Sequence, residues 1–240
     1  NKDVKAFHQL TLKSKHRKNS KTFLIEGLRE IKLAINNNWV IKHLLYCPSI
    51  IKEADLDNSF NNEIEKIEVS LEVYQKLAYR KSTEGVIAIT NCKNHDLKNI
   101  KFKSNNPLII VIEAPEKPGN IGAILRTADA ANIDAVIIAN PKTDLYNPNI
   151  IRSSVGSLFT NNIYCGDTME VISFLKQKNI TIYASSLQAN DLYHNQNYTS
   201  PSAIIIGTED KGISKEWSEN SYKNIKIPMK GEIDSLNLSN

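Results

Sequence analysis

The chain has 240 residues, of which 41% are hydrophobic and 23% charged, and its formal net charge is +4. This length allows one or two globular domains. No apolar run approaches the roughly 20 residues that span a bilayer, which excludes a membrane protein. The three cysteines, Cys47, Cys92 and Cys165, are widely spaced and odd in number, which excludes a disulfide framework and a Cys-x-x-Cys metal site. These features predict a protein of the reducing cytoplasm.

The first 21 residues are strongly basic. They contain seven Lys or Arg residues against Asp3 alone, and His8 and His16 lie in the same stretch. Clustered cations attract phosphate backbones, so this stretch predicts RNA binding. The alternative is a solvated, partly disordered tail. The candidate RNA contacts are Lys13, Lys15, Arg17 and Lys18.

The next segments predict a small α/β unit that covers residues 1–92. Apolar residues recur with helical spacing in one segment, and two short apolar runs are typical of strands. The predicted elements are a helix over 22–37, a strand over 41–47, a helix over 70–79 with Ser70 at its N-cap, and a strand over 85–91. Residues 93–106 are polar and basic and precede Pro107, which predicts a linker between two domains.

From residue 108 the pattern is regular. Fully apolar strands alternate with helices, which predicts a mostly parallel sheet covered on both faces. Strands are predicted at 108–114, 135–139, 180–186, 202–207 and 224–228, and helices at 119–133, 149–160, 167–179 and 214–220. The second domain therefore spans residues 107–240, and the whole chain belongs to the α/β class.

Ligands of parallel sheets bind at the loops that follow the strand C-termini, and three such loops are unusual here. The first, residues 113–130, matches neither the dinucleotide fingerprint nor the P-loop. It places Arg126 about two turns into an otherwise small and apolar helix. The guanidinium needs a partner, which is either Asp129 in a structural ion pair or a phosphate or ribose.

The second and third loops also combine glycine with polar residues. In the second, residues 204–214, Gly207 allows the backbone to approach a ligand closely, and Glu209 follows. The alternative is a plain turn whose acidic residues favour a helix N-terminus. In the third, residues 225–240, small polar residues alternate with leucine, as at the start of a helix that faces a ligand; the alternative is a helix cap at Ser235.

Together, in this order, the three loops resemble the SpoU family, the TrmH-type ribose methyltransferases of the SPOUT superfamily. The matching motifs are Pro-Gly-Asn-Ile-Gly at 118–122 with Arg-Thr-Ala-Asp at 126–129, Gly-Thr-Glu-Asp-Lys-Gly at 207–212, and the Ile-Pro-Met to Leu-Ser segment at 227–239, where Leu238 replaces the family's valine. The resemblance covers about residues 107–240. The first half is similar to the family's L30e-like substrate-binding domain, through residues 23–27 and 85–88.

The resemblance implies a fold and a cofactor that periodicity does not show. The C-terminal segment of the catalytic domain would form a deep trefoil knot, a rare exception to normal chain connections. S-adenosylmethionine would bind in the knot, and no metal would be needed. The implied cofactor-binding residues are Gly207, Thr208, Ile227, Met229, Ser235 and Leu236. The enzyme would be a homodimer with its active site near the interface, and an apolar helix would follow the segment cut at Asn240.

The implied reaction is attack of a ribose 2′-oxygen on the sulfonium methyl. The implied catalytic residues are Arg126, Asn120, Glu209, Ser235 and Asn237. We assign Arg126 to gripping the phosphate beside the target ribose, because a guanidinium group stays protonated and is a poor general base. Ribosomal RNA, at a guanosine of the large subunit, is the first candidate substrate and transfer RNA the second.

Three other functions remain open at this point. One is a non-catalytic RNA-binding protein on the same fold, and another is a nucleotide-dependent enzyme on an ordinary doubly wound sheet. The third is an antibiotic-resistance methyltransferase, which differs only in its target. The methyltransferase hypothesis requires that the loops at 118–129, 207–212 and 227–239 converge on one pocket.

Overall fold

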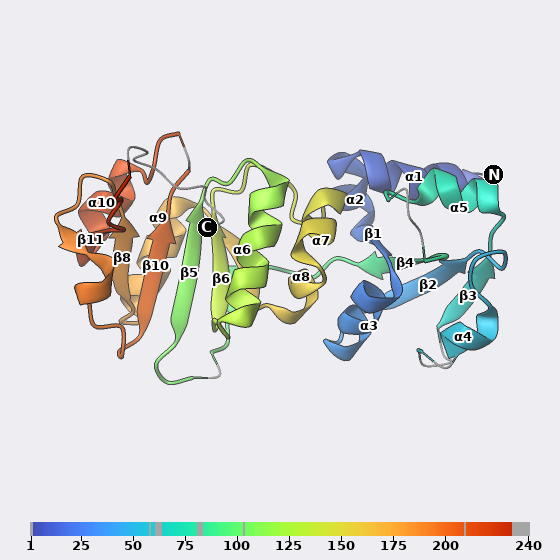
Figure 1. Cartoon of the computed structure of the whole chain (residues 1–240), viewed down its shortest axis with the longest axis horizontal. Coiled ribbons are helices and arrows are strands. Elements are labelled where there is room, and N and C mark those ends of the chain that lie inside the picture. Colours follow the sequence, from blue (N-terminus) through green and yellow to red (C-terminus); the bar gives the residue numbers. More distant parts are fainter. Residues whose placement is uncertain are drawn as a thin grey trace. The chain divides into compact units, whose positions relative to one another are not determined.

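The structure is a computed structural model that describes residues 2–57, 59–60, 64–80, 84–102, 104–208 and 210–231. The chain divides into two compact units (Figure 1). The first comprises Asn1–Lys93 and Asp144–Thr160, and the second comprises Asn94–Thr143 and Asn161–Asn240. The segment Asp144–Thr160, which lies inside the predicted second domain, therefore packs with the first unit.

The first unit contains a four-stranded sheet in the order β1-β4-β2-β3. β1 (Thr22–Glu26) and β2 (Ile41–Tyr46) run antiparallel to β4 (Val86–Asn91), and β3 (Glu65–Glu68) runs parallel to β2. The helices of this unit are α1 (Lys2–Leu12), α2 (Ser14–Ser20), α3 (Leu28–Asn36), α4 (Glu53–Asp57), α5 (Leu71–Leu77), α7 (Pro148–Ser154) and α8 (Ser157–Thr160). As predicted, Ser70 caps α5, because its hydroxyl accepts a hydrogen bond from the Val73 backbone N–H.

The predicted helix over 22–37 is wrong in its first part. Residues Thr22–Glu26 form β1, whose Phe23 and Ile25 pair with Thr90 and Ala88 of β4. Gly27 follows with a φ of +107°, a backbone conformation that ends the strand before α3 begins. Helical spacing of apolar residues continued across this glycine, so the pattern concealed the change from strand to helix.

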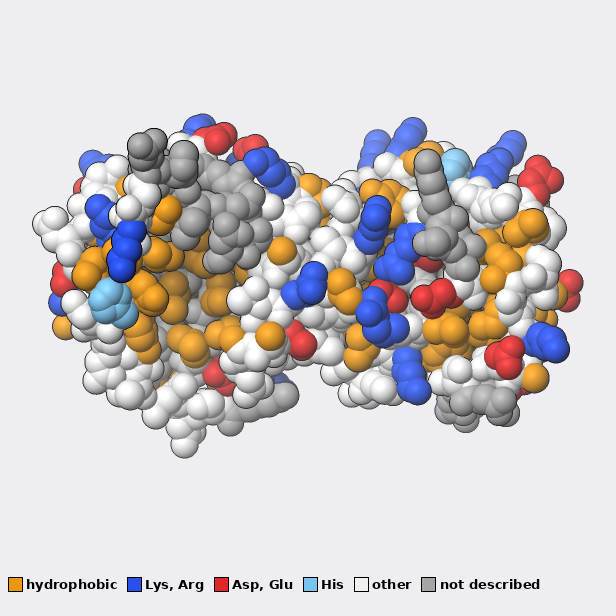
Figure 2. All heavy atoms as spheres, viewed as in Figure 1, with side chains coloured by type: hydrophobic (Ala, Val, Ile, Leu, Met, Phe, Trp, Pro, Cys, Tyr) orange, Lys and Arg blue, Asp and Glu red, His pale blue; other side chains and the backbone are white. Residues whose placement is uncertain are grey.

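The basic N-terminal stretch forms the helices α1 and α2 rather than a disordered tail. Lys13, Lys15 and Lys18 are all exposed. Figure 2 shows basic side chains projecting along the edge of the first unit where α1 and α5 lie. These lysines therefore remain available to a polyanion.

Arg17 differs from its neighbours because its side chain is buried, with 3% of the residue exposed. Its Nε donates to Asp144 Oδ2 at 2.6 Å, and its Nη1 donates to the Leu10 carbonyl at 2.6 Å. The guanidinium has no surface to offer to RNA, so we correct the prediction and remove Arg17 from the RNA contacts. The ion pair instead joins α2 to the segment Asp144–Thr160.

An aromatic cluster explains why this segment packs with the first unit. The rings of Phe23 and Tyr146 stack with centroids 4.3 Å apart, and Trp39 meets Phe159 edge to face at 5.3 Å. The indole N–H of Trp39 also donates to the Phe159 carbonyl. Aromatic pairs of this geometry stabilise beyond their area burial. The predicted helix over 149–160 is split into α7 and α8, because Val155 and Gly156 both have positive φ.

The second unit contains a seven-stranded sheet in the order β7-β6-β5-β10-β8-β11-β9, in which all neighbours are parallel. Its strands are β5 (Leu108–Glu113), β6 (Ala135–Ala139), β7 (Ile163–Gly166), β8 (Thr181–Ser185), β9 (Asp191–Leu192), β10 (Ser202–Ile206) and β11 (Lys223–Lys226). Its helices are α6 (Pro118–Ala130), α9 (Thr168–Gln177), α10 (Lys215–Asn220) and the short 3-10 turns η1 (Leu97–Asn99) and η2 (Tyr193–Asn195). The mostly parallel α/β sheet predicted from the apolar strands is confirmed.

Two features of this unit lay outside the predicted pattern. The short strands β7 and β9 were not predicted. Part of the predicted linker over 93–106 pairs with β7, because Cys165 donates its backbone N–H to the His95 carbonyl at 2.8 Å. This part of the linker is therefore attached to the edge of the second sheet.

The two faces of the second sheet differ in their cover. One face carries a fully buried core, in which Trp217 of α10 packs among residues of the strands and α9. On the other face Ile110, Ile204 and Ile206 are only half-buried, and Figure 2 shows an apolar area on this unit.

Among the described helices, none combines the length and hydrophobicity that a membrane crossing requires. The described part of the chain contains no group of three or more His, Cys, Asp or Glu residues arranged to hold a metal ion.

Candidate cofactor and catalytic site

Because the strands are parallel, the three motif loops all leave the second sheet on the side where its strands have their C-terminal ends. This side is called the sheet edge below. β5 and β10 are neighbours, with Ile112 opposite Ile206 at their C-terminal ends. β8 separates β10 from β11, so the third loop leaves the same edge two strands away from the second. This edge is where parallel α/β sheets bind their ligands.

The first loop turns sharply after β5. Ala114 has a φ of +44°, which non-glycine residues rarely adopt, and its N–H donates to the Ala139 carbonyl of β6 at 2.7 Å. Pro118 occupies the first turn of α6, where a missing N–H costs nothing. Asn120 follows in the same turn and is half-buried. The strained turn thus directs the start of α6 to the sheet edge.

Arg126 lies farther along α6 and is exposed. It follows Gly119 by seven residues, about 10 Å along the helix axis. None of the described acidic residues forms an ion pair with its guanidinium, so the alternative pair with Asp129 is not formed. An exposed guanidinium without such a pair is available to a phosphate.

The second loop is closed by its own backbone. Thr208 and Gly212 exchange hydrogen bonds, with N···O distances of 3.0 and 2.9 Å, and the Lys211 N–H donates to the Thr208 hydroxyl. A Cβ at Gly207 would lie 2.0 Å from the carbonyl carbon of Gly212, so only glycine fits there. The structure shows that the backbone of Gly212 lies close to Gly207. The expected close approach of a ligand to Gly207 stays a prediction. Glu209 lies outside the described residues.

The third loop is described only at its start. Ile227 is half-exposed, at 49%, and Met229 is partly buried. The predicted site residues Ser235, Leu236 and Asn237 lie outside the described residues.

A buried carboxylate that the sequence analysis did not single out joins these loops. Glu113, the last residue of β5, is 5% exposed and accepts the Ser214 backbone N–H at 2.7 Å and the Thr168 hydroxyl at 3.4 Å. Asn140, at the end of β6, donates to the same hydroxyl at 2.7 Å. Because Ser214 precedes α10 directly after the second loop, Glu113 ties that loop to the beginning of the first. The only available signal was an acidic residue at the end of an apolar strand.

Replacing Glu113 with alanine is expected to destabilise the fold by about 1.5–3 kcal/mol, because the partly buried Ser214 N–H loses a charged partner. We also expect weaker binding of S-adenosylmethionine, because the second loop loses its attachment. Glu113→Gln keeps an acceptor and should retain most of both properties. Urea unfolding and calorimetry measure the two effects, with the exposed Glu219→Ala as the control. Equal behaviour of the alanine and control variants would contradict this role.

The loops offer bare backbone where a cofactor would need it. A Cβ placed at Gly119, Gly212 or Gly231 meets no described atom within 4 Å, so each of the three loops faces open space without an intervening side chain. Such backbone can hold a ligand by N–H and C=O groups. The residues present therefore fit a cofactor held mainly by loop backbone.

The all-parallel sheet, with three motif loops at the C-terminal ends of its strands, and the separate smaller unit define a two-unit α/β protein with a candidate ligand site. Residues 107–240 match the SpoU rRNA Methylase family, and residues 1–88 match the MRM3-like substrate binding domain. The chain belongs to the SpoU rRNA Methylase family.

Individual relatives match over the whole chain. The 23S rRNA (guanosine(2553)-2′-O)-methyltransferase RlmP of Bacillus subtilis is 26% identical over 239 residues, which cover 100% of this chain and 92% of the relative. A crystal structure of an RNA 2′-O ribose methyltransferase is 35% identical with a TM-score of 0.84 and covers 100% of this chain and 91% of that one. The SpoU methyltransferase AviRb from Streptomyces viridochromogenes, in complex with the cofactor AdoMet, is 26% identical with a TM-score of 0.91, covering 100% and 93%.

Proposed function

We propose that the chain transfers a methyl group from S-adenosylmethionine to a ribose 2′-hydroxyl of 23S ribosomal RNA. The observation that carries the proposal is the match of residues 107–240 to a family of rRNA methylases, with the three motif loops at one edge of a parallel sheet. Relatives that align over the full chain bear the names of 23S rRNA 2′-O-methyltransferases, and similar structures bind AdoMet.

S-adenosylmethionine, when bound, supplies a methyl group on a positively charged sulfur that an oxygen nucleophile can attack. The methyl–sulfur bond breaks as the oxygen–methyl bond forms, so the remaining tasks of the protein are positioning and removal of the proton that the 2′-hydroxyl loses. The residues proposed to hold the cofactor are Gly207, Thr208, Ile227, Met229, Ser235 and Leu236. The closed backbone loop from Thr208 to Gly212 supports this role, because it keeps the loop's peptide groups in one arrangement.

The other motif residues act on the RNA. Arg126 holds the phosphate beside the target ribose by charge-assisted hydrogen bonds. Asn120 and Asn237 hydrogen-bond the ribose, and Glu209 orients Arg126 or Asn120. Ser235 completes the set of proposed catalytic residues.

We propose a homodimer, an L30e-like fold for the first unit and a C-terminal trefoil knot. The half-buried Ile110, Ile204 and Ile206 support the knot, because an apolar sheet face needs cover that a returning chain segment provides.

We also propose that the reaction takes place in the cytoplasm, where ribosomal RNA is the substrate. Burial raises the pKa of the free thiols Cys92 and Cys165 to about 11, which keeps them protonated at neutral pH.

The experiment that tests the function is methyl transfer by the purified full-length protein. Tritiated S-adenosylmethionine is supplied with 23S ribosomal RNA or with bulk transfer RNA, and methylated riboses are mapped by their resistance to alkaline cleavage. Label in one 23S nucleotide is the expected result. Label in transfer RNA alone would replace the proposed substrate. Calorimetric binding of S-adenosylmethionine without any transfer would favour a non-catalytic RNA-binding protein.

Replacing Lys13, Lys15 and Lys18 together with glutamine is expected to weaken binding of 23S RNA. Each lysine that leaves a phosphate reduces the slope of log K against log salt by about 0.7–0.9, so the slope should fall by about 2. Filter binding at several salt concentrations measures it. The matched control replaces Lys98, Lys101 and Lys178, which are exposed in the second unit. An unchanged slope in the first variant would mean that these lysines are only solvated.

A further inference from the structure

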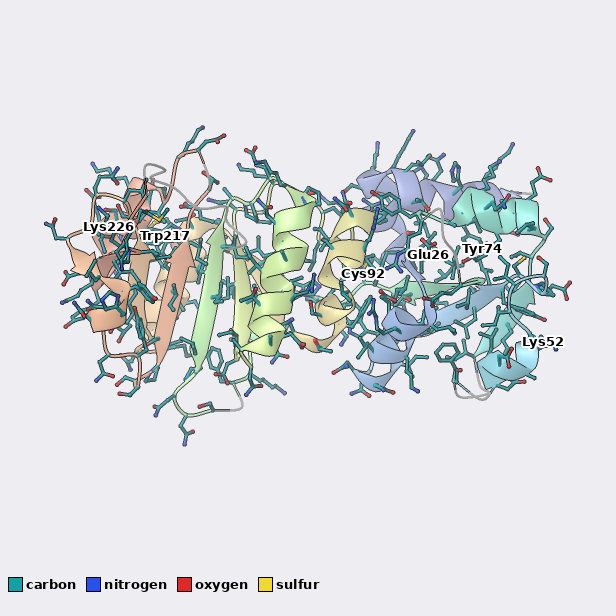
Figure 3. The ribbon with its side chains drawn as sticks, in the orientation of Figure 1. Glu26, Lys52, Tyr74, Cys92, Trp217 and Lys226 are labelled. Atoms are coloured by element: carbon teal, nitrogen blue, oxygen red, sulfur yellow. The ribbon has the colours of Figure 1, made fainter. Side chains whose placement is uncertain are left out.

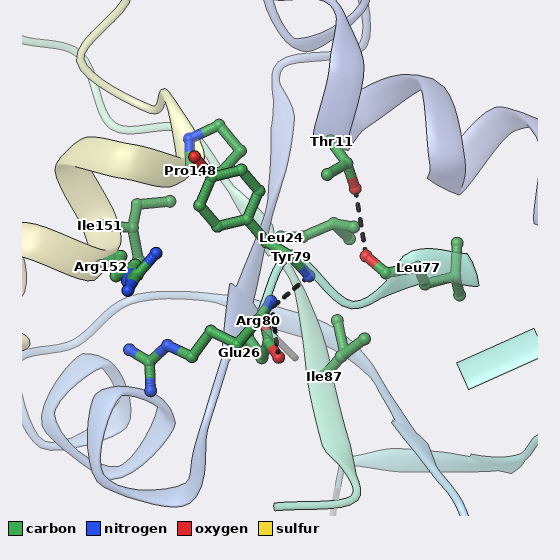
Figure 4. A pocket seen from close by; sticks show the side chains of 10 residues that line it. All are labelled: Thr11, Leu24, Glu26, Leu77, Tyr79, Arg80, Ile87, Pro148, Ile151 and Arg152. Atoms are coloured by element: carbon green, nitrogen blue, oxygen red, sulfur yellow. Dashed lines mark hydrogen bonds between the residues drawn. The ribbon is translucent and has the colours of Figure 1, made fainter. Parts of the chain in front are cut away.

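A hollow opens on the surface of the first unit, between its sheet and α7 (Figure 4). Leu24 of β1, Ile87 of β4 and Ile151 of α7 contribute apolar side chains to it. Tyr79 and Arg80, which follow α5, line it together with Arg152 of α7. It therefore joins residues of the substrate-binding region to a helix from the methylase region of the sequence.

Glu26, the last residue of β1, holds Tyr79 and Arg80 over the hollow. Its carboxylate accepts the backbone N–H of Tyr79 at 2.9 Å and that of Arg80 at 3.1 Å (Figure 4). Burial raises the pKa of Glu26, while these two N–H donors lower it. With the backbone held in this way, 46% of Tyr79 remains exposed to solvent. A half-exposed phenol ring therefore lies beside the hollow, on a backbone that Glu26 holds.

Positive charge accompanies the ring. Arg152 is exposed, and no described acidic residue forms an ion pair with it. Arg80 donates to Glu30 at 3.0 Å and keeps 23% of its side chain exposed. Thr11, near the end of α1, also lines the hollow and leads directly to the exposed Lys13 and its basic neighbours. One lining residue of the hollow therefore lies two positions before Lys13 in the basic stretch of α1 and α2.

We propose that this hollow binds one nucleotide of the substrate RNA, other than the nucleotide that is methylated. The base stacks on Tyr79 above the apolar side chains, and Arg152 and Arg80 contact the adjoining phosphates. Proteins recognise unpaired RNA bases by stacking on aromatic rings and guanidinium planes, and each stacked base contributes substantially to affinity. The inference rests on the proposed function, because it deepens the choice of RNA as substrate.

Three features favour RNA over a peptide as the occupant. The cations at the hollow lie in the same unit as the exposed lysines of α1 and α2, which suits a polyanion longer than one group. Tyr79 and Arg152 line the same hollow, and an aromatic ring with a guanidinium can take a base and its phosphate together. The hydroxyl of Thr11 donates to the Leu77 carbonyl at 3.3 Å, so its oxygen can still accept a hydrogen bond from a polar base edge.

The test compares single variants in binding and methylation of 23S RNA. Tyr79→Ala is expected to raise the KM for 23S RNA about tenfold while leaving kcat at saturating RNA near that of the parent. Arg152→Gln should raise KM severalfold and reduce the salt slope of binding by about 1. Tyr79→Phe keeps the stacking surface and should match the parent. It also covers the case in which the alanine variant does not fold.

The matched control is Lys52→Gln, an exposed cation that Figure 3 shows beside α4 and away from Glu26. Parent-like KM and salt slope for both Tyr79→Ala and Arg152→Gln would overturn the proposal while the methyltransferase function stands. The two proposals can also fail separately. If the parent protein transfers no methyl group but its binding to 23S RNA is still weakened by Tyr79→Ala, the nucleotide-binding hollow stands and the methyltransferase function is wrong.

Discussion

Replacing Arg126 with alanine is expected to abolish methyl transfer and to leave the affinity for S-adenosylmethionine nearly unchanged. The guanidinium is exposed on α6 and has no ion-pair partner among the described acidic residues, so it is not required for folding. Its proposed task is to hold the phosphate beside the ribose. Loss of one well-placed charged donor lowers a rate by about 10²–10³.

Single-turnover methylation of 23S RNA measures the rate, and calorimetry measures cofactor affinity. Arg126→Lys keeps the charge but loses the planar fork, so its rate should lie between those of the parent and the alanine variant. Lys178→Ala, another exposed cation of the second unit, serves as the control and should match the parent. Near-normal turnover in Arg126→Ala would remove this residue from the mechanism. Loss of cofactor binding would assign it to the cofactor site instead.

The sequence predicted the second sheet well because its central strands are continuous runs of apolar residues. Continuous apolar runs such as β5, β6 and β10 have few other interpretations between helices. The missed strands β7 and β9 lie at the two edges of the sheet, where fewer residues are buried. The error over 22–37 had another cause, because Gly27 stood inside a run whose apolar residues also matched a helix.

The candidate site was predicted only in part, for a related reason. The family motifs nominate Asn120, Arg126 and Gly207 as site residues, because a motif can be matched residue by residue. Glu113 was missed, because no local pattern distinguishes a carboxylate that a distant backbone N–H will reach from one that faces water. Its partner Ser214 lies 101 positions away. Such long-range pairs exist only once the fold has brought the strand ends together.

Arg17 illustrates the same limit, and its replacement by alanine is expected to cost about 3–5 kcal/mol of folding free energy. In sequence it was one cation among seven, and nothing local separated it from Lys18. In the structure its side chain and that of Asp144 are 4% and 8% exposed, so removing the guanidinium leaves a buried carboxylate unpaired. Urea unfolding measures the loss, and the exposed Lys18→Ala should change stability by less than about 0.5 kcal/mol.

A double variant distinguishes the effect of losing the ion pair from the effect of losing side-chain volume at this site. Arg17→Met combined with Asp144→Leu removes both charges, and apolar replacements of similar volume often restore the stability that a single charge deletion loses. The double variant should therefore be more stable than either single variant. If Arg17→Ala instead kept full stability and weakened only RNA binding, the guanidinium would have to reach the surface. The attachment of Asp144–Thr160 to the first unit would then depend on the aromatic cluster alone.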